Sequence, residues 1–268
     1  MYNNLNYNKM KHLKVMSVML IIAITTIVMP AKVQAQTGKE IAWKVYDRPS
    51  PKDGESDMTM TLINSKGKER VRYLHQFLKE YDEVEKKVMF FKAPADVKNT
   101  SFLNYSYDDD RDDDQWLYLP ALKKVKRISG GSKDDYFMGS DFTYEDLEKR
   151  SPNKDVHKLL KSETLNGEQC YVIESTPKEE GQYSKRVAWV IKDKWIPLKI
   201  EFYDEDEELL KVLTIPEFKQ LKGYWTVITQ NMENVQRSHK TVIKLSNIEL
   251  EKGLGDEKFT QRAMMKGL

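Results

Sequence analysis

The sequence predicts a mainly β (α+β) fold built on an antiparallel sheet, on three observations. Strand-length apolar segments follow one another and are separated by short stretches with Gly, Asn, Asp or Pro, which favours a meander over parallel βαβ units. Between Ile196 and Tyr203 apolar and polar residues alternate with a period of two, as in a strand with one buried face. No linker divides the chain, and about 230 residues suffice for one large β domain.

The first expected elements after residue 36 are a short helix and a hairpin. We expect the helix over residues 38–48, because Pro49 follows and ends it. A strand is expected over residues 58–62, where apolar residues alternate with threonines. Asn64 to Gly67 then predicts a turn, and a return strand resumes the alternation over residues 71–75.

The rest of the chain predicts ten more strands and two short helices. Asp141 or Thr143 is positioned to cap a short helix whose first turn holds Glu145 and Asp146. A closing helix is expected over residues 256–266. The strands are expected over residues 88–91, 102–107, 116–119, 156–165, 169–176, 186–191, 196–203, 209–218, 224–232 and 240–250.

The N-terminus predicts export. Three lysines precede an apolar run over residues 15–29, and a small-residue site ends at Ala35, which is typical of a secretory signal peptide. At roughly 15 residues the run is short for a bilayer span of about 20. We therefore expect residues 1–35 to be removed by cleavage after Ala35 and residues 36–268 to form a single periplasmic domain. The alternative is a retained N-terminal anchor.

Charge and cysteine content exclude two classes of protein. Removing residues 1–35 takes away four lysines and no acid, which leaves 40 basic and 42 acidic residues. A dedicated nucleic-acid binder would concentrate positive charge, so nucleic acid is not an expected partner. Cys170 is the single cysteine, so no disulfide can form within the chain, and we expect a buried thiol between strand residues.

No pattern of residues predicts catalysis or a cofactor. The histidines lie far apart without a zinc-binding spacing, and no Gly-x-Ser-x-Gly elbow is present, so we assign no catalytic residue, cofactor or metal ligand. The acidic run from Asp108 to Asp114 resembles a calcium loop in composition only. It lacks the glycine and glutamate positions of an EF-hand, and a solvated acidic loop is favoured over an irregular calcium site.

The stretch 115–147 is the most informative part of the chain. The strand expected over 116–119 is apolar on both faces, so both should be covered by protein or ligand. Pro120 ends it, and a basic run follows in which apolar residues separate the cations. A turn at Gly130 and Gly131 leads to large, adaptable side chains at residues 136–138.

This stretch resembles the outer membrane lipoprotein-sorting protein family, the LolA/LolB-like periplasmic lipoprotein carriers, in which a Trp-x-Tyr-x-Pro-Ala-Leu strand precedes a basic segment and a Met-Gly-Ser-Asp-Phe turn. The matching positions are Trp116, Tyr118, Pro120, Ala121, Leu122, Met138, Gly139, Ser140, Asp141 and Phe142. The resemblance implies an incomplete antiparallel β-barrel, with a few short helices covering its concave face and an apolar concavity that shelters acyl chains. It also implies an inner-membrane transporter of the RND or MMPL type as partner, and possibly an outer-membrane acceptor.

We therefore expect a monomeric carrier whose acyl-binding cavity or lid is formed by soft apolar side chains, with basic residues at the cavity mouth. Strand register decides which face each residue occupies. The expected cavity or lid residues are Met58, Met60, Leu62, Phe90, Trp116, Tyr118, Phe137, Met138, Phe142 and Trp189, and the expected basic mouth is Lys123, Lys124, Lys126 and Arg127.

Two other functions stay open at this stage. An envelope lipid hydrolase would use carboxylates near the turn from Met138 to Phe142, namely Asp141, Glu145 or Asp146. A calcium-dependent structural or interaction module would use the run from Asp108 to Asp114 as its metal site.

Overall fold

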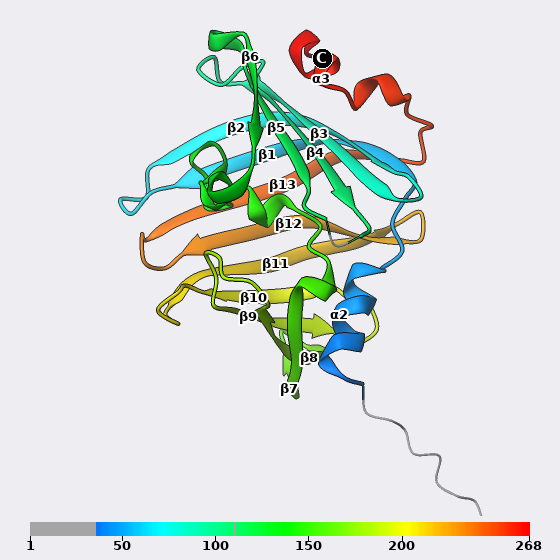
Figure 1. Cartoon of the computed structure of the whole chain (residues 1–268), viewed down its shortest axis with the longest axis vertical. Coiled ribbons are helices and arrows are strands. Elements are labelled where there is room, and N and C mark those ends of the chain that lie inside the picture. The colour runs from blue at the N-terminus through cyan, green and yellow to red at the C-terminus, as the bar shows by residue number, and fades with distance from the viewer. Residues whose placement is uncertain (1–35, 110) are drawn as a thin grey trace, which may run out of the picture. The chain divides into compact units, whose positions relative to one another are not determined.

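The computed structural model describes residues 36–109 and 111–268, which fold around one antiparallel sheet of 13 strands (Figure 1). The strand order is β6-β5-β4-β3-β2-β1-β13-β12-β11-β10-β9-β8-β7, so β6 and β7 are the two ends and the barrel is not closed. This confirms the predicted incomplete antiparallel barrel. The expected signal peptide, residues 1–35 with its cleavage site after Ala35, lies outside the described residues.

The strands lie where the alternation of apolar residues predicts them, and most are longer than expected. The structure also adds β6, which the sequence shows only as a basic run because four of its five side chains are hydrophilic or half-exposed. The bounds are β1 (Asp53–Ile63), β2 (Glu69–Glu80), β3 (Val84–Ala93), β4 (Ser101–Tyr107), β5 (Asp114–Leu119), β6 (Lys124–Ile128), β7 (Asp155–Leu165), β8 (Glu168–Pro177), β9 (Lys185–Ile191), β10 (Pro197–Tyr203), β11 (Leu209–Leu221), β12 (Tyr224–Asn234) and β13 (His239–Leu250).

Successive residues of β4 show that both faces of the sheet are covered. Phe102 is fully buried on one face, which we call the inner face, and packs against Phe137 with ring centroids 5.2 Å apart. Leu103 is fully buried on the opposite, outer face, in a cluster with Phe259 and Met264 near the C-terminus. Two apolar layers therefore sandwich this half of the sheet.

The inner face is covered by the segment that joins β6 to β7, residues 129–154, which we call the connecting segment. It runs across the sheet from one end strand to the other (Figure 1). It contains no α-helix and consists of short 3-10 turns joined by extended backbone. These turns are η2 (Gly130–Asp134), η3 (Phe137–Gly139), η4 (Glu145–Leu147) and η5 (Pro152–Lys154).

The helix α2 (Gly38–Tyr46) lies beside β7 and β8. Thr37 caps it by accepting a hydrogen bond from the backbone N–H of Glu40, whose carboxylate accepts from the N–H of Thr37 in return, a capping box. Ile41 and Ala42 are buried against Val190 and its neighbours on the inner face. The helix ends two residues before the predicted end at Arg48.

The C-terminal helix is shorter than predicted and lies on the other face. Instead of one helix over 256–266, a 3-10 turn, η6 (Asp256–Lys258), precedes α3 (Gln261–Lys266), because Thr260 starts a new helix by capping the N–H of Ala263. The buried Met264 anchors α3 on the outer face, where its carbonyl accepts a hydrogen bond from Ser101. The inner face is thus covered by α2 and the connecting segment, and the outer face by α3.

Two smaller findings complete the fold. Cys170 is buried and forms no disulfide, as expected. Within residues 36–109 and 111–268 there is no helix with the length and apolar character needed to cross a membrane.

Candidate lipid-binding site

A cavity of about 610 Å³ lies between α2, the connecting segment and the inner face of the sheet. This volume falls in the range of small-molecule and cofactor sites. Its wall is largely apolar. The apolar part is contributed by α2 and by strands β2, β8, β9, β10, β12 and β13. The apolar lining includes Ala42, Val45, Leu78, Ile173, Ala188, Val190, Ile200, Trp225, Val227, Leu245, Ile248 and Leu250.

Charged side chains also line the cavity, and most of them are paired. Arg150 forms an ion pair with the buried carboxylate of Asp155 at 2.6 Å and a longer one with Glu145 at 3.3 Å. Arg186, from β9, pairs with the same Glu145. The ammonium of Lys149 lies 3.4 Å from the carboxylates of both Glu80 and Asp108. The cavity therefore has an apolar wall and a fixed polar edge where the connecting segment meets the sheet.

Asp141 fastens the connecting segment to β13. Its side chain is fully buried, accepts a hydrogen bond from the Thr241 hydroxyl at 2.7 Å and lies 2.7 Å from Nδ1 of His239. Its backbone N–H donates to Thr241 at 2.9 Å, and its carbonyl accepts from the Lys211 ammonium at 3.3 Å. Both strands at the centre of this contact, β11 and β13, thus hold one turn of the segment.

Asp146 makes the second attachment, to Lys211. The Lys211 side chain is 0% exposed and that of Asp146 is 4% exposed, and the two form an ion pair. The hydroxyl of Tyr183 donates to the other carboxylate oxygen of Asp146 at 2.9 Å, and the N–H of Thr143 donates to the first at 2.7 Å. A buried charge pair with supporting hydrogen bonds fixes the segment in one position.

Phe137 fills the space between these attachments and the sheet. It is fully buried and its ring lies 5.2 to 6.0 Å from the rings of Phe91, Phe102 and Tyr144. Its N–H donates to the carbonyl of Phe142 at 2.7 Å, which closes a small hairpin. The connecting segment therefore occupies part of the concavity in this structure, and the open cavity lies beside it.

These contacts show what surrounds the acids of the hydrolase hypothesis. The two aspartates at its centre, Asp141 and Asp146, are sealed from solvent by the sheet and hold the connecting segment. Glu145 bridges Arg150 and Arg186 and accepts a hydrogen bond from Gln182 at 2.8 Å. The acids act as structural attachments, since a hydrolytic base must reach both water and substrate.

Six of the ten expected cavity residues lie on or beside the inner face. Met58, Met60 and Phe137 line a second hollow of about 200 Å³ between the connecting segment and the sheet. Leu62 and Phe142 are buried in the same inner core without lining either hollow.

Met138 is half-buried against that core, with its carbonyl accepting a hydrogen bond from Arg72. It has the left-handed backbone conformation that lets the segment turn back on itself. It therefore belongs to the turn of the connecting segment, beside the expected cavity residues.

The other four expected cavity residues lie on the outer face of the sheet. Phe90, Trp116 and Tyr118 lie on the outer face in the cluster under α3, because Met89 and Leu117 take the inner positions in the alternation. Trp189 also points to the outer face, since its neighbours Ala188 and Val190 line the cavity. Both faces of these strands are apolar, so the sequence pattern did not decide the register.

The four residues of the expected basic mouth lie away from this cavity. None of Lys123, Lys124, Lys126 and Arg127 lines the cavity. They lie at the β6 end of the sheet, where Arg127 pairs with Asp114. Instead, the cations of the cavity come from residues that no motif marked, namely Arg48, Lys87, Lys149, Arg150 and Arg186.

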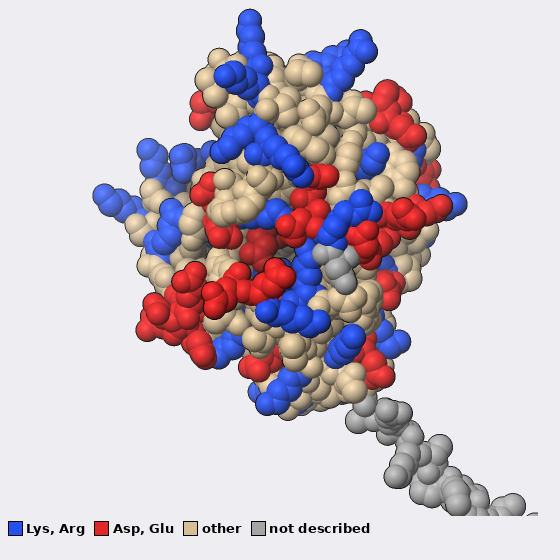
Figure 2. Space-filling model, in the orientation of Figure 1, with Lys and Arg blue, Asp and Glu red and all other residues tan. Residues whose placement is uncertain are grey.

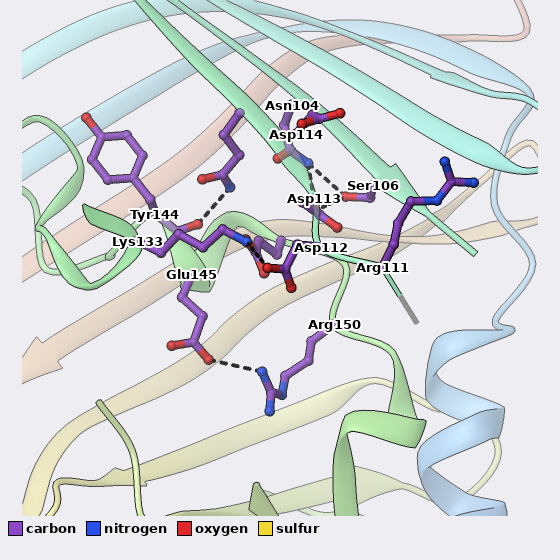
Figure 3. Close-up of polar contacts among 12 residues, drawn as sticks. Asn104, Ser106, Arg111, Asp112, Asp113, Asp114, Lys133, Tyr144, Glu145 and Arg150 are labelled. Carbon is purple, nitrogen blue, oxygen red and sulfur yellow. Dashed lines mark hydrogen bonds and ion pairs between the residues drawn. The ribbon is translucent and has the colours of Figure 1, made fainter. Parts of the chain in front are cut away.

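The described acids of the run 108–114 contact several different basic and polar partners. Asp113 is buried and accepts hydrogen bonds from Asn104, at 3.1 Å, and from Ser106 (Figure 3). Asp112 pairs with Lys154 at 2.9 Å. Within the described residues no group of three or more His, Cys, Asp or Glu is arranged to hold a metal ion. Across this side of the molecule acidic and basic side chains are interspersed (Figure 2).

Glu148 gives the connecting segment a pH response. Burial raises its pKa to about 7, against the opposing effect of the Lys133 ammonium 2.8 Å away. A native state that holds this proton more tightly than the unfolded chain loses stability as pH rises from about 4.5 to about 7. In wild type we expect the free energy of unfolding to fall by on the order of 1–3 kcal/mol over this window. In Glu148→Gln this fall should be absent. Urea unfolding at pH 5 and pH 8 measures both proteins. The exposed Glu69→Gln is the control, and equal pH slopes in wild type and Glu148→Gln would contradict the assignment.

The fold and the cavity define a class of protein: an open antiparallel half-barrel whose inner face shelters an apolar hollow. A solved structure of an outer membrane lipoprotein-sorting protein domain from Vibrio parahaemolyticus is 37% identical, with 85% of this chain and 98% of that chain covered and a TM-score of 0.80. A DUF1329 family protein from Desulfovibrio piger is 34% identical over 85% and 97% of the two chains, with a TM-score of 0.80.

The chain therefore belongs to the family of these two proteins, which are described as a DUF1329 family protein and an outer membrane lipoprotein-sorting protein domain. A LolA superfamily protein from Nitrosomonas europaea shares the fold, with a TM-score of 0.66 at 21% identity over 85% and 100% of the chains. A family model described as an uncharacterized protein matches residues 83–266. No curated protein sequence matches the chain.

Proposed function

We propose that the protein is a periplasmic carrier that binds acyl chains of lipids or lipoproteins in the 610 Å³ cavity and transfers them between the envelope membranes. The observation that carries this proposal is the largely apolar wall of that cavity, on the inner face of a fold shared with a lipoprotein-sorting domain. No covalent step is needed, because the driving force is the exchange of apolar surface between water, membrane and protein.

The energetics require partial burial of the ligand. Each buried methylene contributes about 0.8 kcal/mol, so a long acyl chain held fully would bind with roughly 12 kcal/mol before the costs of association, which corresponds to nanomolar affinity. Such a ligand would leave slowly. A carrier must therefore expose part of the chain or open its cover when it meets an acceptor.

The expected setting follows from the same proposal. The signal peptide would bring a monomeric protein, a single domain over residues 36–268, into the periplasm. There an inner-membrane transporter of the RND or MMPL type would load it, and an outer-membrane acceptor would receive the ligand. The lipid or lipoprotein acyl chain is the proposed partner, and nucleic acid is not.

Extraction of lipids from natively purified protein tests the proposal directly. We expect stoichiometric lipid with at least one acyl chain, measured by mass spectrometry, because the apolar wall would otherwise face water. Protein that is purified from its own envelope and releases no lipid would contradict a carrier role.

A charge placed in the apolar wall should prevent binding. Leu245 is half-buried and lines both hollows, so Leu245→Asp buries a carboxylate against the ligand chain. We expect at least a tenfold loss of affinity for a fluorescent acyl probe. The matched control is Leu122→Asp, at a leucine that is 63% exposed and outside the cavity. Equal losses in both variants would show that the cavity is not the binding site.

A further inference from the structure

Arg48 differs from the other cations of the cavity. It follows α2, lines the cavity and donates a single hydrogen bond, from Nη1 to the carbonyl of Trp195 at 3.4 Å. Among the described residues no carboxylate lies within ion-pairing distance of it. Burial lowers its pKa, and no neighbouring acid offsets this effect.

The other cations that line the cavity are already engaged with acids. Arg150 and Arg186 share Glu145, and Arg150 also pairs with Asp155. Lys87 lies 3.8 Å from Glu85. A partly buried guanidinium with one long hydrogen bond is costly, because it loses hydration without gaining a counter-charge.

The position of Arg48 relative to the apolar wall indicates what supplies that counter-charge. Trp195, which receives the hydrogen bond from Arg48, is also approached by a second cation from α2, because the Lys44 ammonium lies 5.1 Å from the centre of the Trp195 ring. Lys44 is exposed and does not line the cavity, so Arg48 is the cation of this pair that faces the ligand space. Ala42 and Val45 of α2 form part of the apolar lining of the same cavity as Arg48.

We infer that the cavity binds an anionic amphiphile, with the hydrocarbon chain along the apolar wall and a phosphate or carboxylate headgroup against Arg48. The inference rests on the proposed carrier function and names the ligand class for it. The planar guanidinium matches phosphate and carboxylate in bidentate geometry, and its unused N–H groups are available for those bonds. A neutral acyl ester would leave this cation without a counter-charge.

The experiment compares two ligands that share one acyl chain. Isothermal titration calorimetry measures binding of palmitoyl lysophosphatidylglycerol, which is anionic, and of monopalmitoylglycerol, which is neutral. We expect wild type to prefer the anionic lipid by about tenfold or more, the usual effect of a charge-assisted hydrogen-bonded pair. Arg48→Gln should lose this preference while its affinity for the neutral lipid is unchanged.

Three controls make the outcome specific. Arg48→Lys keeps the charge and should retain part of the preference, and the exposed Arg262→Gln on α3 should retain all of it. Inorganic phosphate alone should neither bind with comparable affinity nor displace the anionic lipid; if it does both, the site is for a free anion and the inference fails. If wild type and Arg48→Gln each bind the anionic and the neutral lipid with the same affinity, the headgroup assignment alone is overturned. If wild type binds neither lipid, the result counts against the carrier function itself.

Discussion

Replacing Asp146 with alanine is expected to reduce the free energy of unfolding by about 3–5 kcal/mol, the usual cost of leaving a buried charge without its partner. The ammonium of Lys211 is completely buried and pairs with Asp146, so the variant strands a charge under the connecting segment. Urea unfolding monitored by circular dichroism measures the change.

The matched controls separate lost attraction from a stranded charge. Asp206→Ala removes an exposed carboxylate in the turn between β10 and β11 and should change stability by less than about 0.5 kcal/mol. The double variant Lys211→Met with Asp146→Leu removes both charges and should recover a substantial part of the loss. If Asp146→Ala costs no more than the surface variant, the pair does not hold the connecting segment.

Phe137→Ala is expected to have an effect of similar size, for a different reason. The ring is 0% exposed and packs against three aromatic rings of the inner core, so its removal leaves a cavity and costs about 3–5 kcal/mol. It should also widen the 200 Å³ hollow that Phe137 lines. Urea unfolding measures the stability.

The control for Phe137 is the exposed Leu122→Ala, which deletes apolar atoms that are already in water and should cost less than about 0.5 kcal/mol. A loss below about 1 kcal/mol for Phe137→Ala would mean that the connecting segment is not packed as the structure shows. It would also reopen the possibility that this segment leaves the inner face as a whole.

Strand positions were predictable from local pattern, and strand faces were not. The alternation over 196–203 predicts β10 almost to the residue, because one of its faces is wetter than the other. In β5 the inner Leu117 and the outer Trp116 and Tyr118 are all apolar, because the connecting segment covers one face and α3 the other. A strand covered on both sides has no polar side to set its orientation.

Lys211 is a buried residue whose unusual position is visible in the sequence. Lys211 interrupts an apolar run at the start of β11, and its neighbours Leu210 and Leu213 pack against the inner core. A charge in such a run is either turned to solvent or paired. Nothing local identifies its partner, Asp146, which lies 65 residues earlier in the chain.

The cavity residues were beyond sequence reasoning for a related reason. Arg48, Leu245 and Val190 come from a loop, β13 and β9, and none carries a recognisable motif. The motif residues that stood out, such as Asp141 and Phe142, are distinctive because they must bury and fasten the connecting segment. A strong motif therefore marked the structural attachment of the cover, while the hollow formed beside it.

The sequence by itself determined the antiparallel β class, the order of its strands along the chain and the family resemblance, because turn residues, alternation and a contiguous motif are all local properties. Only the tertiary structure decided which faces are inner and outer, where the hollow lies and which cation faces it unpaired. Those properties arise from strand register and from contacts between segments far apart in the chain, and a one-residue change of register exchanges every side chain between the two faces.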